Sequence, residues 1–337
     1  MNWPEINKFL LQLGEAIAIH AHTKICTTNS QHLSRVHTVS NSDTIYQIDH
    51  YAEQVIVEFL EEHAERFGGI VLIAEGIGTD EISSYPNKRS HQDCALRIIM
   101  DPIDGTRGLM YDKRSAFFLA GAAKNLGPQT CLGDIKTAVM VEIPTSKMIY
   151  ADSLSAIKSE GICAYRKNLL SNEKTPFTIS PSTENHLRGG FAQIARFFSP
   201  GRTELAQIEE ELISGLYPDA KDGEILNFED QYISTGGQLY EILMGKDRFI
   251  ADVRPALYKS MKHLRKGHIC HPYDMAALLI AEEAGIIITD IDENPLNAPM
   301  DTHSPVNWIA YANKAIHQEV SPLFHEILKS HGLIKLN

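Results

Sequence analysis

Apolar positions recur at helical spacing in two stretches near the start of the chain. The first covers residues 6–18, and the second runs over residues 45–60. Side chains three and four residues apart share one face of a helix, so both patterns predict amphipathic helices. Residue types typical of helix boundaries flank the second one, with Ser42-Asp43 before it and Gly68-Gly69 after it. The polar stretch at residues 23–42 predicts a loop.

Short apolar runs separated by turn residues follow, and these predict strands. In the first half they cover residues 70–74, 96–100, 116–122, 137–143 and 147–150. Their short connections favour a largely antiparallel sheet flanked by the two helices. Beyond residue 160 the pattern alternates, with strands at 191–194, 249–252, 286–289 and 308–311, and helices at 203–212, 237–244, 274–284 and from 314 onward. We therefore predict an N-terminal α+β subdomain over residues 1–160 and a C-terminal α/β subdomain over residues 161–337, with a cleft between them.

Two carboxylates follow the apolar run at residues 96–100. Asp101 and Asp104 stand three residues apart, and Gly105 and Thr106 come directly after them. Glycine allows close approach of the backbone to a ligand, and the N–H groups of a helix that starts there would point at an anion. Two hard carboxylates beside such donors favour a phosphate bridged by Mg²⁺. A polar turn after a strand uses the same residue types, so the motif alone leaves both interpretations open.

Asp49 falls on the apolar stripe of the second predicted helix. A charged group in that position costs several kcal/mol unless it is paired, hydrogen-bonded or facing a wet cleft. Two interpretations remain at this stage: an acid held in the core by a salt bridge or hydrogen bonds, and a site residue.

Charge and cysteine content exclude some classes of partner and compartment. The 337 residues carry a formal net charge of −12, which argues against nucleic acid or an anionic membrane as the main partner. The five cysteines are an odd number without a Cys-x-x-Cys pair, which indicates reduced thiols. We find neither a basic-then-apolar leader nor an apolar stretch long enough to span a bilayer, and expect a cytoplasmic protein.

The string at residues 101–106, DPIDGT, resembles the signature of the inositol monophosphatase superfamily of Mg²⁺-dependent, Li⁺-sensitive phosphatases. Further stretches resemble the family and follow its order along the chain. They are residues 48–53, residues 70–76 (a strand ending in a glutamate), residues 271–277 (similar to the family's helix start Trp-Asp-x-Ala-Ala) and residues 282–290. Together they cover most of the chain from residue 44 onward. The resemblance implies a layered αβαβα sandwich and, for this chain, an α+β first half joined to an α/β second half.

The resemblance also implies a set of metal ligands. They are Glu75, Asp101, Asp104, Asp274 and the main-chain carbonyl of Ile103. Asp101 would bridge two Mg²⁺ ions, the first completed by Glu75 and Ile103 and the second by Asp104 and Asp274. A third, weaker ion would join through Glu75. Oxygen ligands without His or Cys favour Mg²⁺, and Mn²⁺ as a substitute, over Zn²⁺.

The implied reaction is attack of a metal-activated water on a phosphate monoester. Asp49, Glu75 and Thr106 would form the catalytic set, with Thr106 hydrogen-bonded to Asp49. Gly105, Thr106 and Asp274 would bind the phosphate. For Thr106 and Asp274 a purely structural role at a helix start remains an alternative.

Several positions depart from the family pattern. Gly76 stands where many relatives have a second glutamate, which leaves binding of a third ion open. Arg107 and Tyr273 replace more usual residues beside the substrate, and residues 234–238 match the family's substrate loop only loosely. Arg107 and Arg254 are candidates for contact with a second anionic group, or are surface arginines.

The leading interpretation is a phosphomonoesterase similar to inositol monophosphatase that acts on a small phosphorylated polyol or sugar. An adenosine 3′,5′-bisphosphate nucleotidase and a sugar bisphosphatase are alternatives on the same fold. A more remote alternative is a regulatory or binding protein that has kept the fold without catalysis. The resemblance also implies a homodimer. His268, Cys270 and His271 lie close in sequence, but no second pair at ligand spacing supports zinc.

Overall fold

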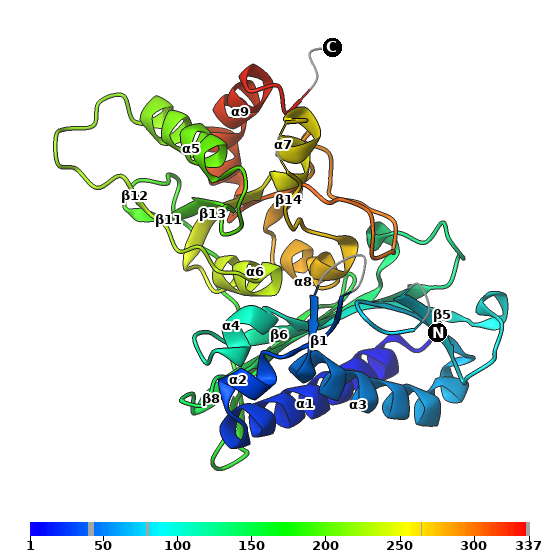
Figure 1. Ribbon diagram of the computed structural model, residues 1–337. Coiled ribbons are helices and arrows are strands. Elements are labelled where there is room, and N and C mark those ends of the chain that lie inside the picture. The colour runs from blue at the N-terminus through cyan, green and yellow to red at the C-terminus, as the bar shows by residue number, and fades with distance from the viewer. Residues whose placement is uncertain (40–43, 79–80, 264, 335–337) are drawn as a thin grey trace.

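The computed structural model describes residues 1–39, 44–78, 81–263 and 265–334 (Figure 1). The predicted boundary at Ser42-Asp43 lies outside these residues. Both early helices are present, as α1 (Trp3–Thr27) and α3 (Gln47–His63). The prediction of a loop from residue 23 was wrong in part. Buried Ile25 extends the apolar face of α1, and a short helix, α2 (Ser30–Leu33), and a strand, β1 (Val36–Val39), follow it.

An eight-stranded sheet forms the larger part of the molecule, in the order β10-β9-β8-β7-β6-β5-β3-β4. Its strands are β3 (Ile70–Ala74), β4 (Ile82–Tyr85), β5 (Leu96–Asp104), β6 (Ala116–Lys124), β7 (Thr137–Ile143), β8 (Tyr150–Ile157), β9 (Gly161–Asn168) and β10 (Lys174–Pro176). Only the β3–β5 pair is parallel, so the sheet is largely antiparallel, as predicted.

Two predictions about the first half of the chain differ from the structure, one on a strand and one on a boundary. The predicted strand at residues 147–150 is mostly a turn, closed by a hydrogen bond from Met148 N to Thr145 O, and β8 begins at Tyr150. The second difference concerns the boundary between the predicted subdomains. Strands β9 and β10 follow residue 160 but belong to the eight-stranded sheet, so this sheet continues to Pro176.

A second sheet has five strands in the order β12-β11-β13-β15-β14. The remaining elements are β2 (Thr44–Tyr46), which pairs with β1, and β11 (Gly190–Ile194), α5 (Arg202–Leu216), β12 (Asn227–Phe228), α6 (Thr235–Leu243), β13 (Asp247–Asp252), α7 (Arg254–Ser260), α8 (Leu278–Glu283), β14 (Ile287–Thr289), β15 (Trp308–Tyr311) and α9 (Lys314–Ser330). Short 3₁₀ helices are η1 (Ala64–Phe67), η3 (His91–Asp93), η4 (Leu132–Asp134) and η5 (Pro272–Met275). The helix predicted at residues 274–284 is divided between η5 and α8.

Alternating side chains build the layers. On β6, Phe118 packs into the core shared with α1 and α3, whereas its neighbour Phe117 points into the core shared with α6 and α8. A third core lies between the five-stranded sheet and helices α5 and α9. The order is therefore helices, sheet, helices, sheet, helices (Figure 1). This confirms the predicted layered αβαβα sandwich.

Two further features concern membrane-spanning segments and cysteine pairing. Among the described residues, no helix combines the length and the apolar character that crossing a bilayer requires. None of the five cysteines forms a disulfide.

One buried acid on β7 gives a testable pH dependence. Glu142 accepts a hydrogen bond from Asp152 N, and burial raises the pKa of its carboxyl from 4.5 to about 7. The folded state therefore binds this proton more tightly than the unfolded chain. Its stabilising contribution is complete below pH 4.5 and is lost as the pH rises through about 7.

The Glu142→Gln side chain stays neutral at every pH. We therefore expect its free energy of unfolding, relative to that of the unmodified protein, to be higher at pH 8 than at pH 5, by up to roughly 3 kcal/mol. Urea unfolding at both pH values measures this difference. Glu160→Gln, at an exposed glutamate, serves as the control. An equal pH trend for both variants would contradict the prediction.

Candidate metal centre

The parallel pair β3–β5 brings the first two predicted ligands together. Ala74 ends β3 opposite Met100 of β5, so Glu75, the next residue after β3, follows at the position beside Asp101, which is still part of β5. Parallel strands end at the same edge of a sheet, which explains how separate strands contribute to one site. Burial raises the pKa of the Asp101 carboxyl, and Glu75 lies close enough for its charge to raise it further.

Three carboxylates converge at this edge. One oxygen from each of Asp101, Asp104 and Asp274 lies within 4.8 Å of the others. Their side chains are 3%, 6% and 7% exposed, so little water screens their mutual repulsion. Among the described residues this is the only group of three or more acidic, His or Cys side chains close enough to share a metal ion. The His268, Cys270 and His271 alternative therefore has no support in the structure.

Burial and mutual repulsion disfavour the charged form of this cluster. Burial raises the pKa of Asp101, and the charges of Asp104, Glu75 and Asp274 raise it further. Burial also raises the pKa of Asp104, although hydrogen bonds to its carboxylate oppose that shift. A bound cation would relieve both effects, because it supplies the positive charge that the cluster lacks.

The start of α6 holds Asp104. Its Oδ2 atom accepts hydrogen bonds from Ser234 Oγ at 2.9 Å and from Gly236 N. Ser234 also caps α6 by accepting from Gly237 N at 2.8 Å. A side chain at position 236 would meet Asp104 Oδ2 at 2.8 Å, so only glycine allows this approach. These donors act on the carboxylate of Asp104, a role that the sequence did not reveal for residues 234–238.

The predicted pair of Thr106 and Asp49 is in contact. Thr106 Oγ1 lies 3.0 Å from Asp49 Oδ1 and 2.7 Å from the carbonyl oxygen of Ile103. One hydroxyl has a single proton, so it donates to one of these acceptors at a time. Asp49 is half-buried, and its Oδ2 accepts from Tyr46 N at 2.7 Å, which closes the first turn of α3. These two hydrogen bonds, from Thr106 and from Tyr46 N, explain how Asp49 is accommodated on an otherwise apolar face of α3.

Gly105 separates Asp104 from α4 (Thr106–Met110), which has five residues. Its φ of +97° lies in the region that favours glycine, and an added Cβ would lie 3.0 Å from Ser234 Cβ. The carbonyl of Ile103, a predicted ligand, lies one residue before Asp104 in the wall of the cleft.

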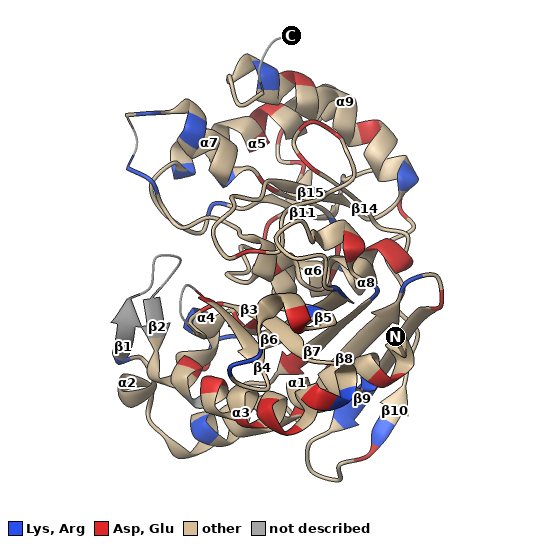
Figure 2. Cartoon of the chain, turned by 90° about the vertical axis from the view of Figure 1, so that its right-hand side faces the viewer, with Lys and Arg blue, Asp and Glu red and all other residues tan. Residues whose placement is uncertain are grey.

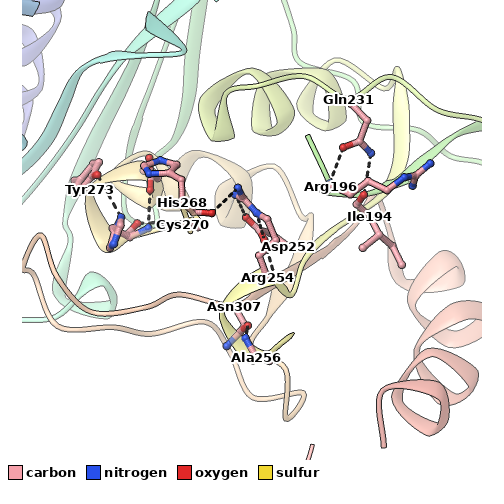
Figure 3. A network of polar contacts seen from close by, with 12 residues as sticks. Ile194, Arg196, Gln231, Asp252, Arg254, Ala256, His268, Cys270, Tyr273 and Asn307 are labelled. Carbon is pink, nitrogen blue, oxygen red and sulfur yellow. Dashed lines mark hydrogen bonds and ion pairs between the residues drawn. The ribbon is translucent and has the colours of Figure 1, made fainter. Parts of the chain in front are cut away.

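Asp274 reaches the cluster from η5. Its Oδ2 accepts from His271 N at 2.6 Å, closing the turn that carries it. Tyr273 stacks on the His271 ring at 5.4 Å and lies in the same cleft. Figure 3 shows this segment beside Cys270 and Arg254.

The two arginines singled out from the sequence differ in their surroundings. Arg254 is 2% exposed and contacts both oxygens of Asp252, so it is not a surface arginine. Its Nη1 also donates to the His268 carbonyl at 3.1 Å, as Figure 3 shows. The guanidinium of Arg107 lies 5.3 Å from the ring centre of Phe198, and that of Arg254 lies 5.6 Å from the same ring centre. Both arginines line the cleft that contains the carboxylates.

Glu81 contributes a further acid beside the site. It is buried, and its Oε1 accepts a hydrogen bond at 3.2 Å from the backbone N–H of Gly76, the position where many relatives have a second glutamate.

The whole chain is similar in structure to several proteins of known structure. The extragenic suppressor protein SuhB from Bartonella henselae aligns over 95% of this chain and 98% of its own, with 16% identity and a TM-score of 0.65. An inositol monophosphatase–fructose 1,6-bisphosphatase aligns over 96% of this chain and 100% of its own, with 17% identity and a TM-score of 0.63. This chain has the inositol monophosphatase fold.

Fructose-1,6-bisphosphatase from Leishmania major shares that fold with 12% identity, coverage of 96% of this chain and 93% of its own, and a TM-score of 0.63. No protein-family model matches the sequence, and no curated protein does. At these identities the inositol monophosphatase fold is established, while the chemistry rests on the residues themselves.

Proposed function

We propose that this protein is a Mg²⁺-dependent phosphatase of small phosphorylated polyols or sugars, similar to inositol monophosphatase. The convergence of Asp101, Asp104 and Asp274 within 4.8 Å carries the proposal. Burying three carboxylates so close together is unfavourable unless a cation joins them.

The donor set fits a hard divalent ion. Glu75, Asp101, Asp104, Asp274 and the carbonyl of Ile103 offer oxygen only, the chemistry that Mg²⁺ and Mn²⁺ prefer. These residues would hold two or three ions. When bound, the ions supply positive charge to the phosphoryl group and Lewis acidity toward a water molecule.

The chain's own residues would orient the reactants. Thr106 Oγ1, directed by Asp49 and Ile103 O, is placed to accept a hydrogen bond from a water nucleophile and fix its direction. Asp49 Oδ1 accepts the hydrogen bond of the Thr106 hydroxyl, so a proton given up by the water could pass through Thr106 to Asp49. The N–H groups of Gly105 and Thr106, together with the Asp274 side of the cleft, would hold the phosphate.

The identity of the substrate distinguishes the proposed polyol or sugar phosphatase from the alternative enzymes on this fold. A sugar bisphosphatase or an adenosine 3′,5′-bisphosphate nucleotidase would use the same carboxylates, and Arg107 beside Phe198 favours a leaving group with an added anionic or flat part. A non-catalytic binding protein is the least favoured, because no acid of the ligand set is missing. We also propose a cytoplasmic homodimer that lithium inhibits.

Phosphate release with Mg²⁺ tests the function. We expect turnover of at least one of inositol 1-phosphate, fructose 1,6-bisphosphate and adenosine 3′,5′-bisphosphate, abolished by chelation and restored by Mg²⁺ or Mn²⁺. Light scattering of the same sample tests the dimer. No metal-dependent release from any of these compounds would contradict the proposal.

A further inference from the structure

The segment that leads into α6 contacts the eight-stranded sheet at every second residue. Tyr232, Ser234 and Gly236 each form a hydrogen bond with β5 or with the residue before β6. The backbone of Ser234 is extended, with a φ of −170°, and alternate residues of an extended segment face the same side. Figure 1 and Figure 2 both show α6 between the two sheets, next to β6. The segment therefore ties the start of α6 to the strand that carries Asp104.

The side chain of Tyr232 provides the first of these contacts. Its hydroxyl donates a hydrogen bond of 2.7 Å to the backbone carbonyl of Ser115, whose own hydroxyl oxygen lies 3.0 Å away. Its ring packs on the backbone of α6, because a Cβ added at Gly237 would lie 2.6 Å from a ring carbon. The guanidinium of Arg114 lies 4.6 Å from the ring centre. Tyr232 is buried, and burial raises the pKa of its hydroxyl, which therefore stays protonated and can donate.

The contact of Tyr232 with Ser115 lies close to the carboxylate of Asp104. Ser115 directly precedes β6, and a Cβ added at Gly105 would lie 3.5 Å from Cα of the first β6 residue and 3.0 Å from Ser234 Cβ. Gly105, the residue after Asp104, therefore fits between the start of β6 and the segment that leads into α6. A shift of this segment along β6 would move its two donors away from Asp104 Oδ2.

We propose that Tyr232 is a positioning residue for the metal centre, and that its hydroxyl raises the affinity for divalent ions by fixing the donors that orient Asp104. This inference rests on the proposed function, because it concerns the ions of the same cleft. Groups that hydrogen-bond to a metal ligand typically contribute about 10- to 100-fold to metal affinity. Tyr232 acts one contact further from the ligand, so we expect a smaller effect.

Removal of a single hydroxyl, with a matched control, tests this role. Tyr232→Phe keeps the ring against α6 and removes only the hydroxyl. The control is Tyr240→Phe, because Tyr240 lies in α6 and its hydroxyl donates a 2.7 Å hydrogen bond to the buried carboxylate of Asp152. Neither Tyr240 nor Asp152 is among the described residues that line the cleft. Each variant thus loses one tyrosine hydrogen bond, and only one of them faces the metal centre.

Mn²⁺ binding without substrate gives the main readout, followed as the electron paramagnetic resonance signal of the free ion. We expect a dissociation constant at least about 5-fold higher for Tyr232→Phe, and one within about 2-fold of the unmodified protein for Tyr240→Phe. In activity measurements, Tyr232→Phe should need more Mg²⁺ for half-maximal turnover, with kcat at saturating Mg²⁺ within about 2-fold. Equal Mn²⁺ affinities in the two variants, or a loss of kcat that saturating Mg²⁺ does not restore, would overturn the inference.

A measurement without metal separates this inference from the proposed function. Hydrogen exchange in metal-free protein reports the N–H group of Gly236, which donates to Asp104 Oδ2. We expect this amide to exchange at least about 5-fold faster in Tyr232→Phe and within about 2-fold of the unmodified rate in Tyr240→Phe. If the unmodified protein binds no Mn²⁺, the proposed function fails, and this exchange alone decides whether Tyr232 positions Asp104. Equal exchange rates in the two variants would show that it does not.

Discussion

Asp104→Asn is expected to remove the phosphatase activity while leaving the protein folded. The substitution takes one charge from the three-carboxylate cluster, so affinity for a divalent ion should fall and activity should drop by at least about 10²-fold. Without metal, the melting temperature should stay the same or rise, because burial disfavours the charged form of Asp104 and the substitution removes its repulsion of Asp101. Phosphate release and thermal unfolding without metal measure the two effects.

The matched control is Asp93→Asn, which makes the same chemical change at an exposed position in η3. It should leave activity within about 2-fold, as exposed substitutions away from a site usually have small effects. Wild-type activity in the Asp104→Asn protein would refute the assignment of this residue. A loss of folding without metal would show that Asp104 serves the fold instead.

Arg254→Met is expected to cause the largest loss of stability among the site residues. It removes the partner of Asp252, whose side chain is fully buried, and the donor to the His268 carbonyl. Leaving a buried carboxylate unpaired costs roughly 3–5 kcal/mol. Urea unfolding at pH 7 measures the change in the free energy of unfolding.

Two further variants show whether the buried charge is the cause. Adding Asp252→Asn to Arg254→Met should recover part of the loss, because the unpaired charge is then gone. Lys246→Met breaks a pair with Glu241 in which the lysine is half exposed, and it should cost at most about 1 kcal/mol. A loss for Arg254→Met no larger than that for Lys246→Met would contradict the assigned role.

Strands built mostly of buried apolar residues could be predicted from the sequence almost to the residue. Residues 70–74, 137–143 and 308–311 match β3, β7 and β15. Each of these strands is buried throughout, so burial alone determined the pattern. Strand β9 escaped prediction because half-buried and exposed residues interrupt its pattern, and α7 because it has only seven residues.

The metal ligands were predicted from motifs, whereas the contacts that hold them were not. The structure places Asp101, Asp104 and Asp274 together, but Ser234 and Gly236 reach Asp104 across about 130 residues of chain. Such a contact depends on how α6 packs between the two sheets, and no local pattern encodes it. The sequence did offer one clue, because Ser234 followed by Thr and two glycines is typical of a helix start that approaches other backbone closely.

Diffraction from crystals soaked with Mn²⁺ and phosphate would show the metal centre itself, since anomalous scattering locates the metal. We expect at least one Mn²⁺ ion bound by oxygens of Asp101, Asp104 and Asp274, with phosphate beside it. Manganese found only elsewhere, or these carboxylates turned apart and paired with lysine or arginine, would contradict this expectation.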